Sequence, residues 1–251
     1  MDISAKVERF AISIPDLDQP IYRIFSARRF RQLLVKNQIG LVEPRMWDDP
    51  MESAYRSCTL ELDGSSISLG NLGLRWYGQC WTYNRDSDAM WRIYSPDKYG
   101  VRLQTTPRQL LAHMHSLSEE SWIYLGGVSY RTRAQILHHL AAHAYFDFVN
   151  NGHPDSIVRT LLMKRPEFEH EHEVRLLFHD HAGHVANRGV VDFSFDVNQV
   201  GTEIALDPRI SGPDFVAEQA LYELLGARIP IIQSDLYQLR NIRLISQEQK
   251  A

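Results

Sequence analysis

The stretch KRPEFEHEHEVRLLF, residues 164–178, determines our interpretation of the fold. Two basic residues and a proline open it, four glutamates follow, and the apolar run at its end is broken only by Arg175. This pattern predicts a β-strand that enters a hydrophobic core from a charged lead-in. Because side chains two residues apart on a strand share a face, Glu171, Glu173 and Arg175 should point one way and His172 the other.

Two carboxylates and a guanidinium at the start of a buried strand allow two interpretations. One is a solvated edge strand that carries an internal ion pair. The other is a catalytic or ligand-binding carboxylate fixed on a rigid element. The sequence leaves both open.

Composition is typical of a globular protein. The chain has 251 residues, 44% apolar and 23% charged, which is enough for one large domain or two small ones. No apolar run approaches the roughly 18 residues of a membrane span, and the N-terminus lacks the apolar segment of a signal peptide. Cys58 and Cys80 alone make no disulfide framework, which fits a reducing cytosol. We therefore expect a cytoplasmic protein without membrane contact.

The net charge of −4 gives no global basic field for nucleic acid. A local basic patch stays open as an interpretation, because five basic residues gather early in the chain: Arg23, Arg28, Arg29, Arg31 and Lys36.

Hydrophobic periodicity and turn signals predict an α+β protein. Residues 1–20 are expected to form a polar N-terminal lead, and residues 21–245 a single α+β domain. Strands are expected at 21–25, 40–43, 79–83, 99–103, 123–130, within 164–178, and at 189–197, 202–206, 229–233 and 242–245, and helices at 27–37, 84–95, 106–115, 132–150, 155–163 and 213–225, with a loop at 60–75. The strand at 189–197 follows the strand within 164–178 and is expected to pair with it as a hairpin. Because the strands cluster instead of alternating with helices, a mainly antiparallel mixed sheet with flanking helices is expected.

Two further segments allow both a structural and a functional interpretation. The turn Asp48-Asp49-Pro50 is a plain Asx-turn, or with Glu52 it forms a polar pocket. The aromatic-rich middle of the chain is core, or it is a wall on which a planar ring stacks.

Several familiar motifs are absent from the sequence. It has no Gly-rich phosphate loop, no dinucleotide fingerprint, no nucleophile elbow and no CxxC pair. Two histidine groups could suggest a metal, but surface or core histidines explain them better, so no metal is predicted. These groups are His138, His139 and His143, and His170, His172, His179, His181 and His184.

Motifs along residues 20–240 resemble, in order, those of the bacterial and phage family of unknown function numbered 2971 (DUF2971). The motifs are Tyr22-Arg23, the segment 48–52 (DDPME), the strand Cys80-Trp81-Thr82, the segment 90–94 (MWRIY), Tyr99-Gly100-Val101, the element from Lys164 to Arg175, the segment 205–208 (ALDP) and the segment 233–236 (QSDL). The resemblance implies no assigned activity.

A more distant similarity is to ADP-ribosyltransferase-like folds. It implies an Arg on an early strand, a hydroxyl residue in the middle and a Glu at the head of a late strand. Arg23, then Tyr94 or Ser95, then Glu173 take these places, although Thr82 competes for the middle one. Glu171-His172-Glu173 is similar to the ExE motif of arginine-modifying members.

This resemblance implies an NAD-dependent ADP-ribosyltransferase or NAD-consuming enzyme, a glycosyltransferase by class, acting as a toxin or phage-defence effector. NAD would be the substrate, and a protein or nucleic acid the acceptor. Glu173, Glu171 and Tyr94 would be catalytic. The cofactor-binding residues would be Tyr22, Arg23, Trp81, Thr82, Trp91, Ser95 and Arg175.

Two alternatives remain open at this point. The first is a non-catalytic module that binds a nucleotide signal or a protein. The second is a metal-dependent hydrolase or nuclease that uses the carboxylates, which would suit Mg²⁺ or Mn²⁺. Its ligands would be Asp48, Asp49, Glu52, Glu171 and Glu173. The sequence does not indicate an oligomeric state.

Overall fold

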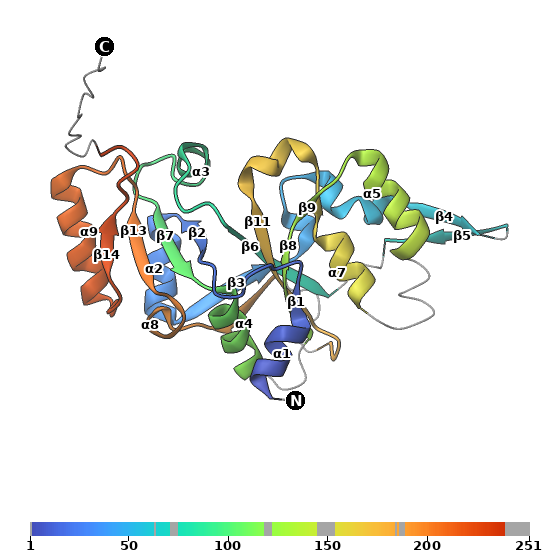
Figure 1. The fold of residues 1–251 in the computed structure, drawn as a ribbon, viewed down its shortest axis with the longest axis horizontal. Helices are drawn as coiled ribbons and strands as arrows, with labels where there is room; N and C mark the ends of the chain where they lie inside the picture. The colour runs from blue at the N-terminus through green and yellow to red at the C-terminus, as the bar shows by residue number, and fades with distance from the viewer. Residues whose placement is uncertain are drawn as a thin grey trace, which may run out of the picture.

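The computed structural model describes residues 2–62, 64–70, 75–117, 122–144, 154–183, 185 and 189–238. These residues form an α+β fold around one ten-stranded mixed sheet with flanking helices (Figure 1). The strand order is β1-β8-β11-β6-β2-β7-β13-β14, and β3, with its partner β12, also pairs with β6. Within this sheet only β1 with β8 and β13 with β14 pair in parallel, so the predicted mainly antiparallel sheet is confirmed.

The strands of the large sheet are β1 (Ala11–Ile12), β2 (Ile21–Phe25), β3 (Gln38–Val42), β6 (Trp76–Thr82), β7 (Val101–Thr105), β8 (Trp122–Gly127), β11 (Glu173–His179), β12 (Val190–Ser194), β13 (Glu203–Leu206) and β14 (Ile231–Gln233). Two small sheets pair β4 (Thr59–Leu62) with β5 (Ser65–Ser68), and β9 (Ser129–Tyr130) with β10 (Met163–Lys164).

The α-helices are α1 (Ile3–Phe10), α2 (Ala27–Lys36), α3 (Asp88–Tyr94), α4 (Pro107–Ser116), α5 (Arg133–His139), α7 (Asp155–Leu161), α8 (Val197–Val200) and α9 (Gly212–Leu224). Side-chain caps set several of their starts: Ser26 caps α2, Ser87 caps α3 and Thr106 caps α4. Each described helix is too short or too polar to cross a bilayer.

Strand β11 lies in the centre of the sheet, between β6 and β8. Its first six residues are all buried. Val174 and Leu176 belong to one hydrophobic cluster, and Leu177 belongs to a second cluster on the other face. Burial on both faces explains why residues 174–178 of this strand are apolar apart from Arg175. The interpretation of β11 as a solvated edge strand is therefore wrong.

The charged lead-in to β11 is not part of the strand. Residues Pro166–Glu171 form the 3₁₀ helix η4, with proline at its first turn. His172 follows in the left-handed conformation, with φ of 41°, and only Glu173 begins the strand. The expected alternation of side chains across residues 170–172 is therefore wrong, because these residues are not extended.

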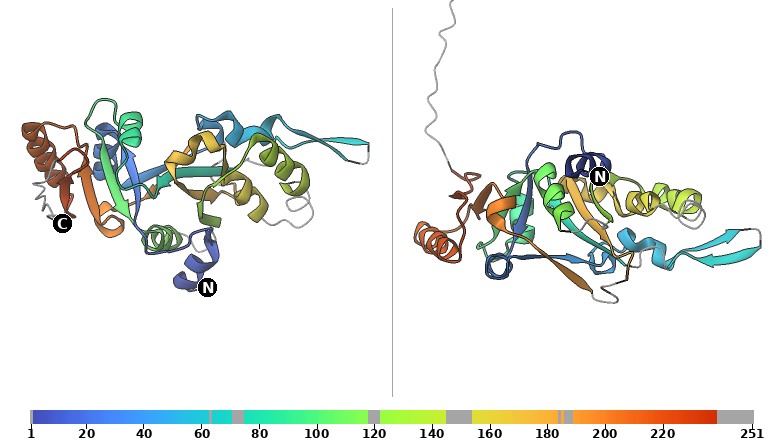
Figure 2. Two further views of the ribbon diagram at one scale, coloured as in Figure 1. Left: turned by 45° about the horizontal axis from the view of Figure 1, so that its top comes forward. Right: turned by 90° about the horizontal axis from the view of Figure 1, so that it is seen from below.

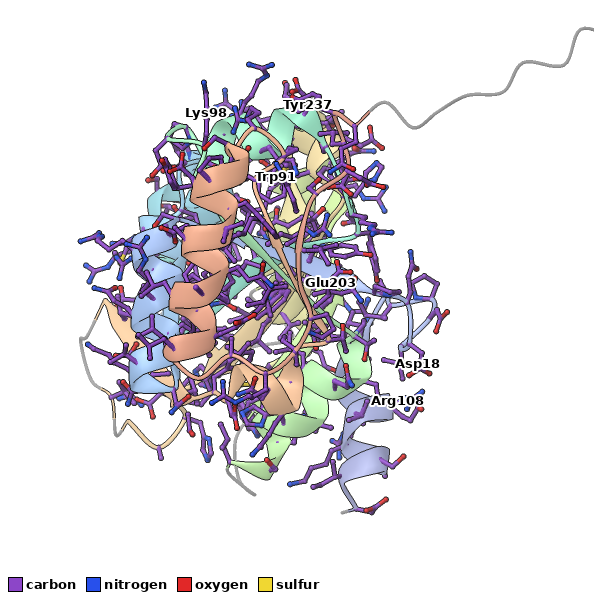
Figure 3. The ribbon with its side chains drawn as sticks, turned by 90° about the vertical axis from the view of Figure 1, so that its left-hand side faces the viewer. Asp18, Trp91, Lys98, Arg108, Glu203 and Tyr237 are labelled. Atoms are coloured by element: carbon purple, nitrogen blue, oxygen red, sulfur yellow. The ribbon has the colours of Figure 1, made fainter. Side chains whose placement is uncertain are left out.

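The N-terminal residues contact the sheet. Strand β1 pairs in parallel with β8, and Val7 of α1 is 1% exposed. Asp18 accepts two hydrogen bonds from Arg108 of α4, at 2.9 and 3.0 Å, and Figure 3 shows the two side chains beside each other. The division into a lead and a domain at residue 20 stays a prediction.

Three other expectations differ from the structure. The loop expected at 60–75 contains the hairpin β4–β5, in which Leu62 lies opposite Ser65 and which projects from the body (Figures 1 and 2). Strand β12 pairs with β3, not with its sequence neighbour β11. The helix expected at 132–150 is α5 followed by a π-helical turn, Leu140–Ala144, and residues 145–150 lie outside the described part of the chain.

Candidate active site

The large sheet splits along one edge of β6. On its other edge β6 pairs with β11 over its whole length. On the split edge it pairs with β2 only at Tyr22 opposite Thr82, and with β3 only at Val42 opposite Gly78. Between these two points, no described strand pairs with this edge of β6. A buried main-chain carbonyl without a hydrogen-bond partner raises the free energy of the folded state.

Arg23 fills part of this gap. Its Nη1 donates a hydrogen bond to the main-chain oxygen of Cys80, one of the carbonyls that the split exposes. Burial lowers the pKa of Arg23 below its ordinary value. The split in the sheet therefore holds a guanidinium in the gap between β2 and β6.

A pocket opens beside this split, with a volume of about 390 Å³ including the open solvent at its mouth. The two ends of the predicted site meet there, since Arg23 from the early strand and Glu173 from the late strand both line it. The other lining residues are Tyr22, Ile24, Cys80, Trp81, Thr82, Met90, Tyr94 and Glu171.

Glu173 lies at the inner wall, 4% exposed, with Arg175 behind it. Arg175 donates from Nε to Oε1 and from Nη2 to Oε2 of Glu173, both at 2.9 Å. Lys164 Nζ donates to Oε2 of Glu173 at 3.1 Å. Such paired, charge-assisted contacts fix the position of the carboxylate. Both oxygens of Glu173 are thus held from the protein side while the residue still lines the pocket.

The protonation state of Glu173 follows from these neighbours. Burial by itself would raise its pKa, but the charge of Arg175 and Lys164 outweighs burial and lowers the pKa to about 2. Lys164 is affected in the opposite way: burial would lower its pKa, but Glu173 and Glu52 raise it. The pocket therefore holds an ionised carboxylate at neutral pH.

Glu171 is brought beside Glu173 by the fold of its loop. Lys164 Nζ donates to Glu171 Oε2 at 2.5 Å, and the Thr82 hydroxyl donates to the Glu171 carbonyl at 2.5 Å. The two glutamates therefore lie together because both accept from the ammonium of Lys164, and not because they share a strand face. Lys164 is 8% exposed, and its pairing role was not predicted from the sequence.

Three aromatic side chains, those of Tyr22, Trp81 and Tyr94, also line the pocket. Tyr94 is exposed at the mouth, and desolvation of its hydroxyl together with the charge of Glu171 raises its pKa. Tyr22 is buried and stacks under the guanidinium of Arg102, whose Cζ lies 5.1 Å from the ring centre. Trp81 also lines the pocket and donates its indole N–H to Gln79 at 3.0 Å.

Three residues predicted to bind the cofactor do not line this pocket. Trp91 is completely buried, and its indole N–H donates to Asp86. Ser95 is also completely buried, and its hydroxyl donates to Asp207 at 2.6 Å. Arg175 is 0% exposed and reaches the pocket only through Glu173. Packing directs all three side chains away from the pocket lining, so their cofactor contacts stay a prediction.

The acidic residues of the 48–52 turn do not line the candidate pocket. Asp48 is exposed, whereas Asp49 accepts a hydrogen bond from the Met51 amide at 3.0 Å, which is the Asx-turn interpretation. Asp49 also accepts two hydrogen bonds from Arg165, at 3.0 and 3.1 Å. Glu52 lies behind the pocket, paired with Arg175, and burial raises its pKa.

The histidines of the described residues show no metal arrangement. No group of three or more His, Cys, Asp or Glu residues within the described ranges is placed to hold an ion. His179 instead stacks on Trp122 and contacts the ring of Trp76 at an interplanar angle of 34°, and burial lowers its pKa to about 4. His184 lies outside the described residues, as does the side chain of His143.

Lys164→Met should raise the pKa of Glu173, because the variant removes one of the two cations that lower it. Ionised Glu173 stabilises the fold above its unfolded-state pKa near 4.5, and this contribution disappears as pH falls toward 2. In the Lys164→Met variant, the stabilising contribution of ionised Glu173 should disappear at a higher pH than in the wild type. A carbon-13 NMR titration of the glutamate carboxyls measures the shift, with Lys36→Met as the control. An unchanged Glu173 titration would contradict this electrostatic account.

Comparison with known proteins gives one family match. Residues 90–176 match the model of a family described as "Protein of unknown function (DUF2971)". The resemblance that the sequence motifs indicated is confirmed over these residues. A comparison with curated proteins finds no match.

Three solved structures, all of Thermus sp. 2.9 DarT, are similar to the chain. The complex with carba-NAD+ has a TM-score of 0.39 and 13% identity, and it covers 87% of this chain and 96% of that one. The complex with NAD+ has a TM-score of 0.40 and 12% identity, with the same coverage. The complex with ADP-ribosylated ssDNA has a TM-score of 0.40 and 11% identity, covering 88% and 96%.

Proposed function

We propose that the protein is an NAD-consuming enzyme that transfers ADP-ribose, with Glu173 as its catalytic carboxylate. The observation that carries the proposal is an ionised, nearly buried glutamate in one pocket with Arg23, Tyr94 and a second glutamate. Ionised carboxylates in water-excluded sites stabilise positive charge that develops during a reaction. A role as a toxin or phage-defence effector belongs to the same proposal.

Cleavage of NAD breaks the bond between the ribose anomeric carbon and the nicotinamide nitrogen. The bonding electrons leave with nicotinamide, and the ribose acquires oxocarbenium character, as in glycoside cleavage. Glu173 would accept a hydrogen bond from a ribose hydroxyl and stabilise this cation. Arg175 and Lys164 hold the carboxylate in place, so it needs no reorganisation as the charge develops.

The remaining lining residues have positions that suit the other parts of the reaction. Arg23 would hold the diphosphate by charge-assisted hydrogen bonds. Tyr94, at the mouth, would stack on the nicotinamide ring in place of the buried Trp91. Glu171 would take the proton of the acceptor hydroxyl or amine as that group attacks the anomeric carbon.

NAD should raise the melting temperature of the protein, whereas ATP should not. Binding to the folded state at about 100 times the Kd stabilises by about 2.7 kcal/mol. For a chain of this size that corresponds to a shift of about 5–11 °C. A thermal-shift titration measures it. An equal shift with ATP, or none with NAD, would contradict the proposed substrate.

A binding module is the second candidate, and one observation favours it. Both glutamates are already paired with cations, as in a structural network. Such a module would be stabilised by NAD without releasing nicotinamide, so a nicotinamide assay separates the two candidates. The metal-dependent hydrolase is less favoured, because Arg165, Arg175 and Lys164 occupy the oxygens that would hold the ion.

A further inference from the structure

A second, larger cavity adjoins the candidate active site. This α2 groove has a volume of about 1120 Å³ including open solvent, and it lies between α2 on one side and β3 and β12 on the other. Arg23 lines both the groove and the catalytic pocket. A chain lying in the groove would therefore reach the pocket at Arg23.

One face of α2 gives the groove its charge. Arg29, Gln32, Leu33 and Lys36 line it at the spacing that brings helical residues onto one face. Arg29 and Lys36 are exposed and form no ion pair with any residue in the described part of the chain. Arg31, by contrast, pairs with Glu218.

The balance of charge in the groove is positive. Arg23, Arg29 and Lys36 contribute three cations, and Asp192 is the single acidic residue among the lining residues. The whole chain carries a net charge of −4, so this face differs in sign from the protein as a whole. Electrostatic complementarity therefore favours an anionic ligand.

Arg23 provides an unsatisfied donor at the inner end. Its Nη1 is bonded to the Cys80 carbonyl, while its Nε is buried and has no hydrogen-bond partner among the described residues. A buried donor left unpaired is costly. An anionic oxygen at the junction of groove and pocket would satisfy it.

We propose that the α2 groove binds a single phosphodiester strand and presents it to the catalytic pocket as the acceptor of ADP-ribose. Arg29 and Lys36 are seven residues apart, so their backbones are about 10 Å apart along the helix. Cations spaced along a concave groove follow one strand, as in single-strand binding proteins. The acceptor role rests on the proposed function, whereas the binding itself does not.

The test is the fluorescence anisotropy of a labelled single-stranded oligonucleotide with the full chain, in the absence of NAD. The double variant Arg29→Glu/Lys36→Glu should weaken binding at least tenfold. Neutral counterparts, Arg29→Gln/Lys36→Gln, should reduce the magnitude of the slope of log K against log salt by about 1.4, at about 0.7 per lost contact. Arg28→Glu is the matched control, because Arg28 is exposed on α2 but does not line the groove. It should change affinity less than twofold.

Asp192→Asn provides a result that misfolding cannot imitate. Removing the groove's acidic charge should tighten oligonucleotide binding. The proposal is overturned if both substitution sets leave binding unchanged, or if Arg28→Glu weakens it as much as the double variant. It is also overturned if poly-glutamate displaces the strand equally well, or if the double variant impairs NAD binding alone.

The binding assay also separates this proposal from the proposed function. A wild-type protein that binds the strand through the groove but releases no nicotinamide from NAD would contradict the enzyme and support the groove. If the protein cleaves NAD but its oligonucleotide affinity is unchanged by substitution of Arg29 and Lys36, the result would support the enzyme and contradict the groove.

Discussion

Glu173→Gln should reduce the rate of nicotinamide release from NAD by about 100-fold or more. Loss of one preorganised electrostatic contact to a charged transition state has an effect of this size. The amide keeps the shape of the side chain and one oxygen that can accept from Arg175, but it carries no charge. The measurement is nicotinamide release at saturating NAD, expressed per folded protein from a thermal unfolding curve.

Glu203→Gln is the matched control for this variant. Glu203 accepts a hydrogen bond from the buried Arg102 at 2.9 Å, so its substitution also disturbs an arginine–glutamate pair. It lies on β13, however, and does not line the pocket. Its nicotinamide release should stay within twofold of the wild type. Equal losses in the two variants would show that Glu173 acts through stability and not through chemistry.

Arg175→Met should lower the free energy of unfolding by about 3–5 kcal/mol. Removing one partner of a buried ion pair has a cost of this size, because the remaining charge is left uncompensated. Two carboxylates would be affected, since Arg175 pairs with both Glu173 and Glu52. The side chain is 0% exposed and lies 4.3 Å from the ring centre of Trp47, a contact that methionine only partly replaces.

Urea denaturation at pH 7 measures the Arg175→Met effect. Arg92→Met is the comparison variant, because Arg92 pairs with Asp88 on an exposed helix face. Exposed pairs of this kind contribute little, so no measurable change is expected. A loss of less than about 1 kcal/mol in Arg175→Met would mean that the buried charges are solvated or protonated.

Local sequence signals predicted the elements of the site well. Ser26 and Ser87 mark the starts of α2 and α3, and the apolar run after Glu173 marks β11. These are short-range effects of caps and alternation, which a sequence displays directly. The resemblance to ADP-ribosyltransferase-like folds, and not these local signals, implied an Arg on an early strand and a Glu at the head of a late one, and Arg23 and Glu173 both line one pocket.

Side-chain direction could not be predicted in the same way. On α3, Met90 and Tyr94 are four residues apart and line the pocket, whereas Trp91 faces inward. Aromatic residue types suit both a core and a ligand wall, so the sequence did not separate Trp91 from Tyr94. Trp91 donates to Asp86, five residues earlier, and Asp86 is held in turn by groups farther along the chain, since it accepts from Arg102 and from Ser234.

The motifs near the C-terminal end of the chain have structural roles in this fold. Asp207 accepts from the Ser95 hydroxyl and from Arg209, and it lies at the end of β13. Ser234 donates to Asp86 at 2.6 Å. These contacts connect β13 and β14 to the region around α3. Such buried polar networks explain the residues without assigning them a ligand.

Lys164 was missed for a specific physical reason. Alternating glutamates after Pro166 resemble an extended strand, but the proline begins a 3₁₀ helix that ends at His172 in the left-handed conformation. This turn places Glu171 beside Lys164, which also donates to Glu173 although it lies nine residues before it in the chain. The pairing depends on one left-handed residue that is not glycine, and residue type gives only a weak signal for that conformation.

A structure of the protein with a non-cleavable NAD analogue tests the central claim most directly. The account predicts that the nicotinamide ribose lies against Glu173, with a ribose hydroxyl hydrogen-bonded to its carboxylate and the nicotinamide ring against Tyr94. It also predicts that the diphosphate contacts Arg23. A dinucleotide bound away from Glu173, or bound with its adenine in this pocket, would contradict the account.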